Sequence, residues 1–151
     1  TFNTPDSLAT ALKDIGVDVV SLAGNHALDY GYNGLCRTID VFDNIGLSHL
    51  GTYKTAEDQE KILIKDVKGV KIAFINYTYG TNGIPLPSGK DFCVNLIDKD
   101  FIKKQINGLH VPIKIFYNRN FGRFFLCNIT TLKKKFRNKY GNYDRYMVFF
   151  I

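Results

Sequence analysis

The chain has 151 residues, enough to bury the core of one ordinary domain, and 45% of them are hydrophobic, which excludes a disordered composition. The net charge of +6 is uneven: residues 1–105 hold 11 Lys and Arg against 13 Asp and Glu, whereas residues 106–151 hold nine against Asp144 alone. No apolar run approaches the roughly 20 residues of a membrane-spanning helix, and no basic-then-apolar leader follows Thr1. We therefore expect neither a transmembrane segment nor a signal peptide in this chain.

The first 46 residues predict a helix, a buried strand and a second helix. The Thr-Pro-Asp run at residues 4–6 is typical of a helix start, with a capping hydroxyl, a proline and then an acid facing the helix dipole. The apolar stripe of this helix is Leu8, Ala11, Leu12 and Ile15. Residues 17–22 form a β-branched run that favours a buried strand. The second helix is expected to begin near Tyr32 and end at Gly46, with its buried stripe at Leu35, Ile39, Phe42 and Ile45.

Beyond residue 46 the pattern alternates short strands and helices. The expected elements are a strand at 47–50, a helical turn at 56–60, hairpin strands at 61–67 and 70–77, a loop at 78–91, a strand at 93–97 and a helix from 98 to about 106. This alternation argues for an α/β layered domain in which helices flank a mixed sheet.

The most informative stretch is Gly24-Asn25-His26-Ala27-Leu28-Asp29, where the first strand gives way to the second helix. Sites in open α/β sheets form beyond the carboxyl ends of strands. The Asn25 amide oxygen is a hard, neutral ligand suited to a divalent cation, and the His26 imidazole exchanges protons near neutral pH. Asp29 is placed to orient His26, as the third group of a catalytic triad does. Taken alone, Gly-Asn-His favours an Asx-turn beside a structural histidine, and only the surrounding sequence favours a site.

Several blocks in order resemble one group of bacterial proteins. They are Phe2-Asn3-Thr4-Pro5, the strand at 17–22, residues 25–31, His49-Leu50-Gly51, residues 77–83 and residues 94–98. The Gly-Asn-His block is similar to that of the calcineurin-like metallophosphoesterases, and the whole set resembles their CapA-type branch, the capsule (poly-gamma-glutamate) synthesis proteins. The resemblance covers residues 1–105 and implies a partial metallophosphoesterase-like domain. It also implies that Asn25 binds metal, that His26 is the catalytic acid and that Asp29 orients it.

The resemblance further implies a centre of two divalent ions of the Mn, Zn or Fe type in the whole protein. The family takes its acidic ligands from strands before this segment and further histidines from blocks after it, and neither set is present. We therefore expect this truncated segment to bind no metal by itself and to be inactive alone. We expect His49 to have a structural role or to lie at the rim of the site. The residues around His110 do not match the family's histidine block, so we assign His110 no role. The implied partners are the capsule or poly-gamma-glutamate synthesis machinery, and the implied location is the cell surface or membrane.

Residues 106–151 depart from every family block. Phe, Ile, Lys, Asn and Tyr make up 27 of these 46 residues, against 37 of the preceding 105, and their codons are the richest in A and T. A reading-frame shift accounts for this composition most simply, so we expect this basic, aromatic-rich tail to lie outside the family domain. The alternative is a functional tail that binds nucleic acid or an anionic membrane or polymer, although no RNA-binding signature supports nucleic acid.

Three functions stay open at this point. The favoured one is a fragment of a CapA-type protein of capsule or poly-gamma-glutamate biosynthesis. The second is a fragment of a metal-dependent phosphoesterase or nucleotidase, which a phosphatase assay with added metals would reveal. The third is a non-catalytic basic binding module, which salt-dependent binding lost on deleting residues 106–151 would reveal.

Overall fold

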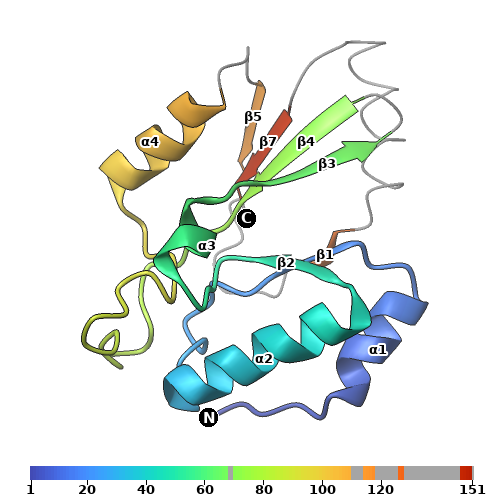
Figure 1. The fold of residues 1–151 in the computed structure, drawn as a ribbon, viewed down its shortest axis with the longest axis vertical. Coiled ribbons are helices and arrows are strands. Elements are labelled where there is room, and N and C mark those ends of the chain that lie inside the picture. Colours follow the sequence, from blue (N-terminus) through green and yellow to red (C-terminus); the bar gives the residue numbers. More distant parts are fainter. Residues whose placement is uncertain (68–69, 110–113, 118–125, 128–146, 151) are drawn as a thin grey trace.

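The computed structural model in Figure 1 describes residues 1–67, 70–109, 114–117, 126–127 and 147–150. Helices and short strands alternate along these residues, so the predicted α/β class is confirmed. The elements in chain order are α1 (Ser7–Asp14), β1 (Val19–Ser21), α2 (Gly31–Ile45), β2 (Ser48–Leu50), α3 (Ala56–Glu60), β3 (Leu63–Val67), β4 (Val70–Ile75), α4 (Lys99–Gly108), β5 (Lys114–Tyr117), β6 (Leu126–Cys127) and β7 (Met147–Phe150).

The first sheet has the strand order β2-β1-β6 and carries α1 and α2 on one face (Figure 1). β1 runs parallel to β2, with Val20 opposite His49, and antiparallel to β6. All three residues of β1 are buried, as expected for a β-branched strand covered on both faces. The α2 stripe predicted from the sequence is confirmed at Leu35, Ile39 and Phe42, which are buried, and its fourth residue, Ile45, packs partly buried against the same core. Gly46 ends the helix in the left-handed conformation, with φ of 65°.

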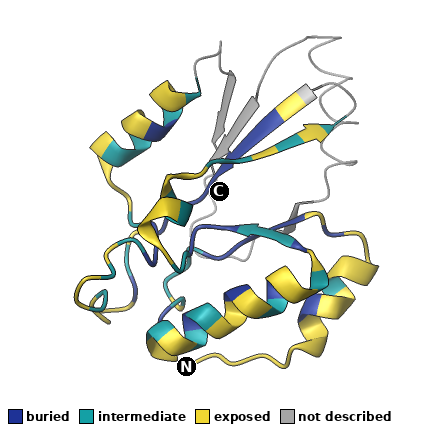
Figure 2. Ribbon diagram, in the orientation of Figure 1, coloured by how far each residue is buried: buried dark blue, intermediate teal, exposed yellow. Residues whose placement is uncertain are grey.

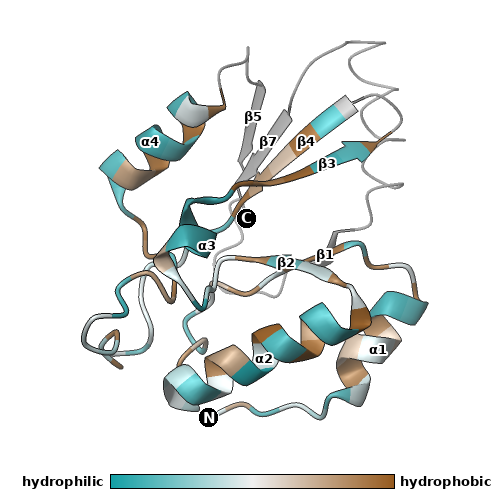
Figure 3. Ribbon diagram, in the orientation of Figure 1, coloured by the Kyte–Doolittle hydropathy of each residue, from teal (hydrophilic) through white to brown (hydrophobic). Residues whose placement is uncertain are grey.

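The second sheet has the strand order β3-β4-β7-β5, and α4 lies beside it (Figure 1). β3 and β4 form the predicted antiparallel hairpin, in which Val67 pairs with Val70, and the turn between them lies outside the described residues. β7 runs parallel to both β4 and β5. Buried residues concentrate on β1, β4 and the inner edge of α2 in Figure 2, whereas α3 is mainly hydrophilic in Figure 3. The α4 residues Phe101, Ile102 and Ile106 pack on Ala73, Ile75 and Tyr77.

Of the helices α1, α3 and α4, the last two begin where the sequence predicted and α1 does not. α3 and α4 begin where predicted, because Thr55 accepts a hydrogen bond from the Asp58 amide and Asp98 accepts from the amides of residues 100 and 101. α1 begins later than predicted, at Ser7 with Asp6 as its cap, and no side-chain cap bond forms. Its predicted stripe is right only at Leu12, which packs on the core: Leu8 and Ile15 are 47% and 72% exposed, Ala11 is exposed too, and Ala9 is buried instead. The helix contacts the core along the edge formed by Ala9 and Leu12, of which only Leu12 belongs to the predicted stripe.

Residues 93–97 were predicted as a strand and instead join two loops. The Tyr53 amide donates to the Cys93 carbonyl at 3.0 Å, and the Asn95 amide donates to the Gly51 carbonyl at 2.9 Å. On the other side, the Thr78 amide donates to the Asn95 carbonyl at 2.9 Å. Each pairing is a single bridge, too short for a ladder, because the partners are loop ends. The segment therefore links the carboxyl ends of β2 and β4, close to the candidate site.

Candidate functional site

The candidate site lies in the loop between β1 and α2. The chain leaves β1 at Ser21 and makes three consecutive turns, closed by amide-to-carbonyl bonds from Ala27 to Gly24, from Asp29 to His26 and from Gly31 to Leu28, at 3.0, 3.2 and 2.8 Å. Leu28 is 2% exposed and anchors the loop in the core. His26 is exposed and Asn25 is half-buried, so neither is part of the apolar core. The structure thus places both side chains at the carboxyl end of β1, where the sequence predicted them.

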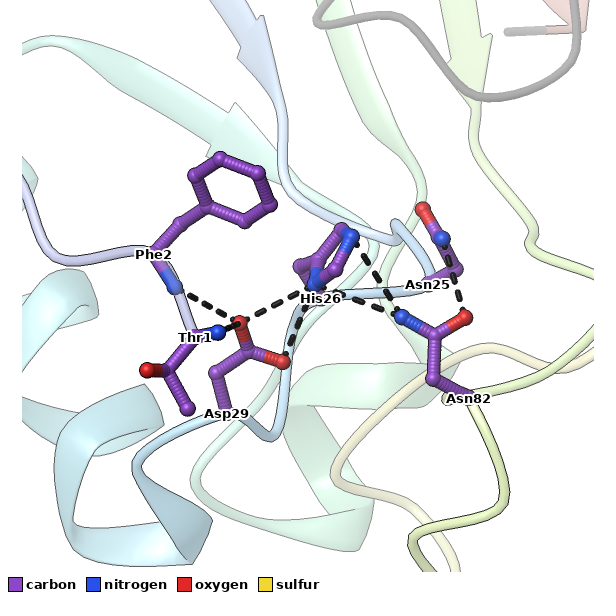
Figure 4. A network of polar contacts seen from close by, with 6 residues as sticks. All are labelled: Thr1, Phe2, Asn25, His26, Asp29 and Asn82. Carbon is purple, nitrogen blue, oxygen red and sulfur yellow. Dashed lines mark hydrogen bonds and ion pairs between the residues drawn. The ribbon is translucent and has the colours of Figure 1, made fainter.

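His26 and Asp29 form a close pair. The His26 Nδ1 atom lies 3.1 and 3.0 Å from the two carboxylate oxygens of Asp29 (Figure 4). The Asp29 side chain is only 6% exposed, while that of His26 is 40% exposed. The carboxylate is therefore buried on the Nδ1 side of the imidazole, and the rest of the ring is partly open to solvent.

Asp29 is held in its ionised form. Burial acts to raise its pKa, but the Phe2 amide, which donates at 2.8 Å, and the neighbouring His26 outweigh burial, so the pKa lies below its ordinary value. An ionised carboxylate can only accept hydrogen bonds, so His26 Nδ1 must carry the hydrogen between them. In the neutral ring this leaves Nε2 with a free lone pair, and in the imidazolium it leaves Nε2 with a transferable proton. The Phe2 ring packs edge-on against the imidazole, with ring centroids 4.5 Å apart.

A fourth polar side chain, Asn82, joins this group from the loop after β4. Asn25 Nδ2 donates to Asn82 Oδ1 at 3.0 Å, and Asn82 Nδ2 lies 3.3 Å from His26 Nδ1 and 3.4 Å from Nε2 (Figure 4). Asn82 lies within the family block at residues 77–83, but no role was predicted for it from the sequence. The available signal was the Asn82-Gly83 pair, which is typical of a tight turn with positive φ.

The loop is braced from behind by buried polar groups. The Ala23 amide donates to Asn76 Oδ1 at 2.7 Å, and the Asn76 carbonyl accepts from Asn95 Nδ2 at 3.1 Å. Asn76 and Asn95 are 3% and 1% exposed. Gly51 passes so close that a Cβ there would lie 2.1 Å from Asn76 Oδ1. The position of the Gly24–Gly31 loop therefore depends on residues that follow β2 and β4.

The donor set suits one ligand position of a divalent-cation site. Asn25 uses its amide nitrogen on Asn82, which leaves the carbonyl oxygen, a hard ligand, for a cation. Across the described part of the chain, no three His, Cys, Asp or Glu side chains come close enough together to hold an ion. The described residues therefore fit a contribution to such a centre and do not complete one.

The remaining histidines lie apart from this group or outside the described residues. His49 is on β2, its side chain is 15% exposed, and its Nε2 pairs with Asp43 at 2.9 Å. Its buried Nδ1 has no partner among the described residues. This arrangement suits the structural or rim role predicted for it. His110 is outside the residues that the structure describes.

Comparison with known proteins places this sequence in a family. Residues 1–110 match the model of the family described as "Bacterial capsule synthesis protein PGA_cap". The chain is 35% identical over 68 residues to the "Capsule biosynthesis protein CapA" of Bacillus anthracis, a match that covers 45% of this chain and 16% of that protein. It is 37% identical over 68 residues to the "PGA biosynthesis protein CapA" of Bacillus subtilis (strain 168), covering 44% of this chain and 18% of that protein.

The match therefore spans less than a fifth of the length of either curated relative. The search of solved structures finds no match. The family model nevertheless covers well over half of the chain, so the resemblance inferred from the sequence blocks is confirmed. The chain belongs to the bacterial capsule synthesis protein PGA_cap family, as a segment of the CapA type.

Proposed function

We propose that this chain contributes part of a metallophosphoesterase-like centre to a protein of capsule or poly-gamma-glutamate synthesis. The observation that carries the proposal is the contact of His26 Nδ1 with the buried, ionised Asp29, since it leaves the exposed side of the imidazole for proton transfer. The position beyond the carboxyl end of β1 supports it, because α/β enzymes place their reacting groups at that edge.

In this proposal His26 acts as the general acid. Its Nε2 atom donates a proton to the leaving oxygen of a phosphoester, and Asp29 holds the ring and stabilises the imidazolium form. Asn25 contributes its carbonyl oxygen as one metal ligand. When bound, a divalent ion of the Mn, Zn or Fe type would polarise the phosphoryl group and lower the pKa of a coordinated water. A proton donor of this kind contributes about 10²–10⁴-fold to a rate.

The names of the two Bacillus relatives support the biological assignment. Both are described as biosynthesis proteins, one of capsule and one of PGA, so the proposed partners are the machinery that makes or exports such a polymer. We place the whole protein at the cell surface or membrane on the same ground. None of the helices described here has the length and apolar character needed to cross a bilayer. The alternative, a phosphoesterase or nucleotidase unrelated to polymer synthesis, would use the same three residues on a different substrate.

A chimera tests the proposal directly. Residues 1–109 of this chain would replace the family-matched region of the Bacillus subtilis relative in a polymer-forming strain, and polymer yield would be measured. We expect polymer from the chimera and a loss of about 100-fold or more on His26→Ala, the scale of a missing general acid. His49→Gln is the matched control, because His49 pairs with Asp43 away from the dyad, and it should retain the yield.

The same chimera separates the two substrate classes. Purified protein would be assayed with manganese on a nucleoside monophosphate and on an activated phosphodiester. Polymer yield that survives His26→Ala would contradict the assigned role of the dyad. Nucleotide hydrolysis that depends on His26, without any effect on polymer yield, would favour the nucleotidase alternative.

A further inference from the structure

We propose that Asn82 is a positioning residue that aligns both Asn25 and His26. This inference rests on the proposed function, because it assigns a task within that same site. The side chain of Asn82 is the only one in Figure 4 that contacts both of these residues, and its two polar atoms are divided between them.

The first contact fixes the direction of the Asn25 amide. An asparagine binds cations through its carbonyl oxygen and repels them with its NH₂ group, so a freely rotating amide is a poor ligand. Because Asn25 Nδ2 donates to Asn82 Oδ1 at 3.0 Å, the Asn25 carbonyl oxygen points away from Asn82 (Figure 4). Asn82 thus selects the amide orientation in which Asn25 presents oxygen outward.

The second contact restrains the His26 ring. Asn82 Nδ2 lies almost equally far from His26 Nδ1, at 3.3 Å, and from Nε2, at 3.4 Å, so the amide contacts the ring between its two nitrogens and is not in line with the lone pair of either one. Asp29 alone fixes one edge of the ring and permits rotation about that contact. The Asn82 amide supplies a second point of restraint on the ring itself, away from the Asp29 carboxylate, which is how outer partners orient reacting groups.

The backbone of Asn82 offers a rival explanation, namely that the turn itself requires an asparagine. Asn82 has φ of 53° and Gly83 has φ of 78°, and the Ile84 amide closes the turn on the Thr81 carbonyl at 3.0 Å. Asparagine tolerates this left-handed region better than most residues. Glycine tolerates it better still, so Asn82→Gly removes the side chain while keeping the turn, and it separates the two explanations.

The experiment compares the complete chain with Asn82→Gly and Asn82→Asp by NMR, without metal. In Asn82→Gly the side-chain amide of Asn25 and the ring of His26 should both gain rapid motion, while slow exchange of the Ile84 amide shows that the turn persists. In Asn82→Asp, measured at a pH where the imidazole is neutral, Asn25 should stay ordered, because a carboxylate oxygen still accepts its N–H, whereas His26 should be released, because a carboxylate offers the neutral ring no N–H. Unchanged order of Asn25 and His26 in Asn82→Gly would overturn the inference. If Asn82→Gly opens the turn, a His26 ring that stays ordered in Asn82→Asp overturns it instead.

Titration with Mn²⁺ alone separates this inference from the proposed function. Because the described residues do not complete a metal site, this titration uses the chimera described above; if Asn25 is a ligand, Mn²⁺ should broaden the Asn25 and His26 signals of the chimera before those of Asn44, an exposed asparagine on α2. Asn82→Gly should then need about tenfold more Mn²⁺ for the same broadening, the scale of a lost outer partner. Equal broadening in both proteins would contradict the alignment of Asn25 by Asn82. Absence of broadening in the chimera that keeps Asn82 would refute the ligand role of Asn25, and the metal-free measurement on the chain itself would still decide the positioning role of Asn82.

Discussion

Substitution of Gly51 by alanine should damage the candidate site more than its own location suggests. Gly51 has φ of 99°, a region that costs an L-residue about 1–3 kcal/mol. A Cβ there would also lie 2.1 Å from Asn76 Oδ1 and 2.7 Å from the Ala23 nitrogen, within the bond that braces the Gly24–Gly31 loop. Opening that bond leaves buried polar groups unpaired, at about 1–3 kcal/mol. We therefore expect Gly51→Ala to lower the free energy of unfolding by about 2–6 kcal/mol.

The matched control is Gly89→Ala. Gly89 has φ of 70°, close to that of Gly51, but no heavy atom lies within 4 Å of its Cβ position. It should therefore lose only the backbone contribution, about 1–2 kcal/mol. Urea unfolding followed by circular dichroism measures both variants, and their slopes should agree. If the two differ by less than about 0.5 kcal/mol, the collision with the brace does not control stability, and our reasoning about the Asn76 contact is wrong.

Three further predictions concern the core, the activity and the tail. Tyr77→Phe should cost about 1–2 kcal/mol, because it leaves Oε1 of the buried Gln105 without its donor. Burial raises the pKa of Tyr77, so its contribution is complete below about pH 10 and declines as pH rises, and urea midpoints of Tyr77→Phe should be less sensitive to alkali. The chain alone should show no manganese- or zinc-dependent hydrolysis of an activated phosphodiester, and hydrolysis abolished by His26→Ala would contradict this. Limited proteolysis should cut first beyond residue 106, whereas resistance equal to that of residues 17–77 would place the tail within the domain.

Local patterns in the sequence predicted the elements that local forces build. The α2 stripe, its glycine stop and the positions of α3 and α4 depend on contacts within one or two turns of a helix, so their signals are adjacent in the chain. The β3–β4 hairpin is equally local. The placement of Asn25, His26 and Asp29 also followed from one strand-to-helix junction.

Contacts between distant segments were not predictable in this way. Asn82 meets His26 across 56 positions, and Asn76 meets Ala23 across 53, so no spacing rule connects them. The pairing of β6 with β1 and of β7 with β4 is similarly distant, and composition alone assigned that part of the chain no partner. Most of the α1 stripe was misplaced because the helix is short. The residues of α1 that become buried are those that share a core with α2, and the periodicity of α1 alone does not identify them.

The two parts of the candidate site are held by different means, and this decides which should fail first. His26 and Asp29 are three residues apart in consecutive turns, so the loop after β1 makes their contact by itself. Asn25 depends instead on Asn82, which is 57 positions away. Asn82 lies in a loop whose backbone is anchored mainly at Thr78, where the Thr78 amide donates to the Asn95 carbonyl.

Loops with few buried contacts open at lower free energy than the elements that they join. Opening of residues 79–86 would release Asn25 while leaving the His26–Asp29 pair intact. On gradual warming we therefore expect the Asn25 side-chain amide and the Ile84 backbone amide to exchange with solvent before the Asp29 backbone amide does. Simultaneous exchange of all three would show that the dyad and the Asn82 turn form one cooperative unit, and that the alignment of Asn25 is as stable as the dyad itself.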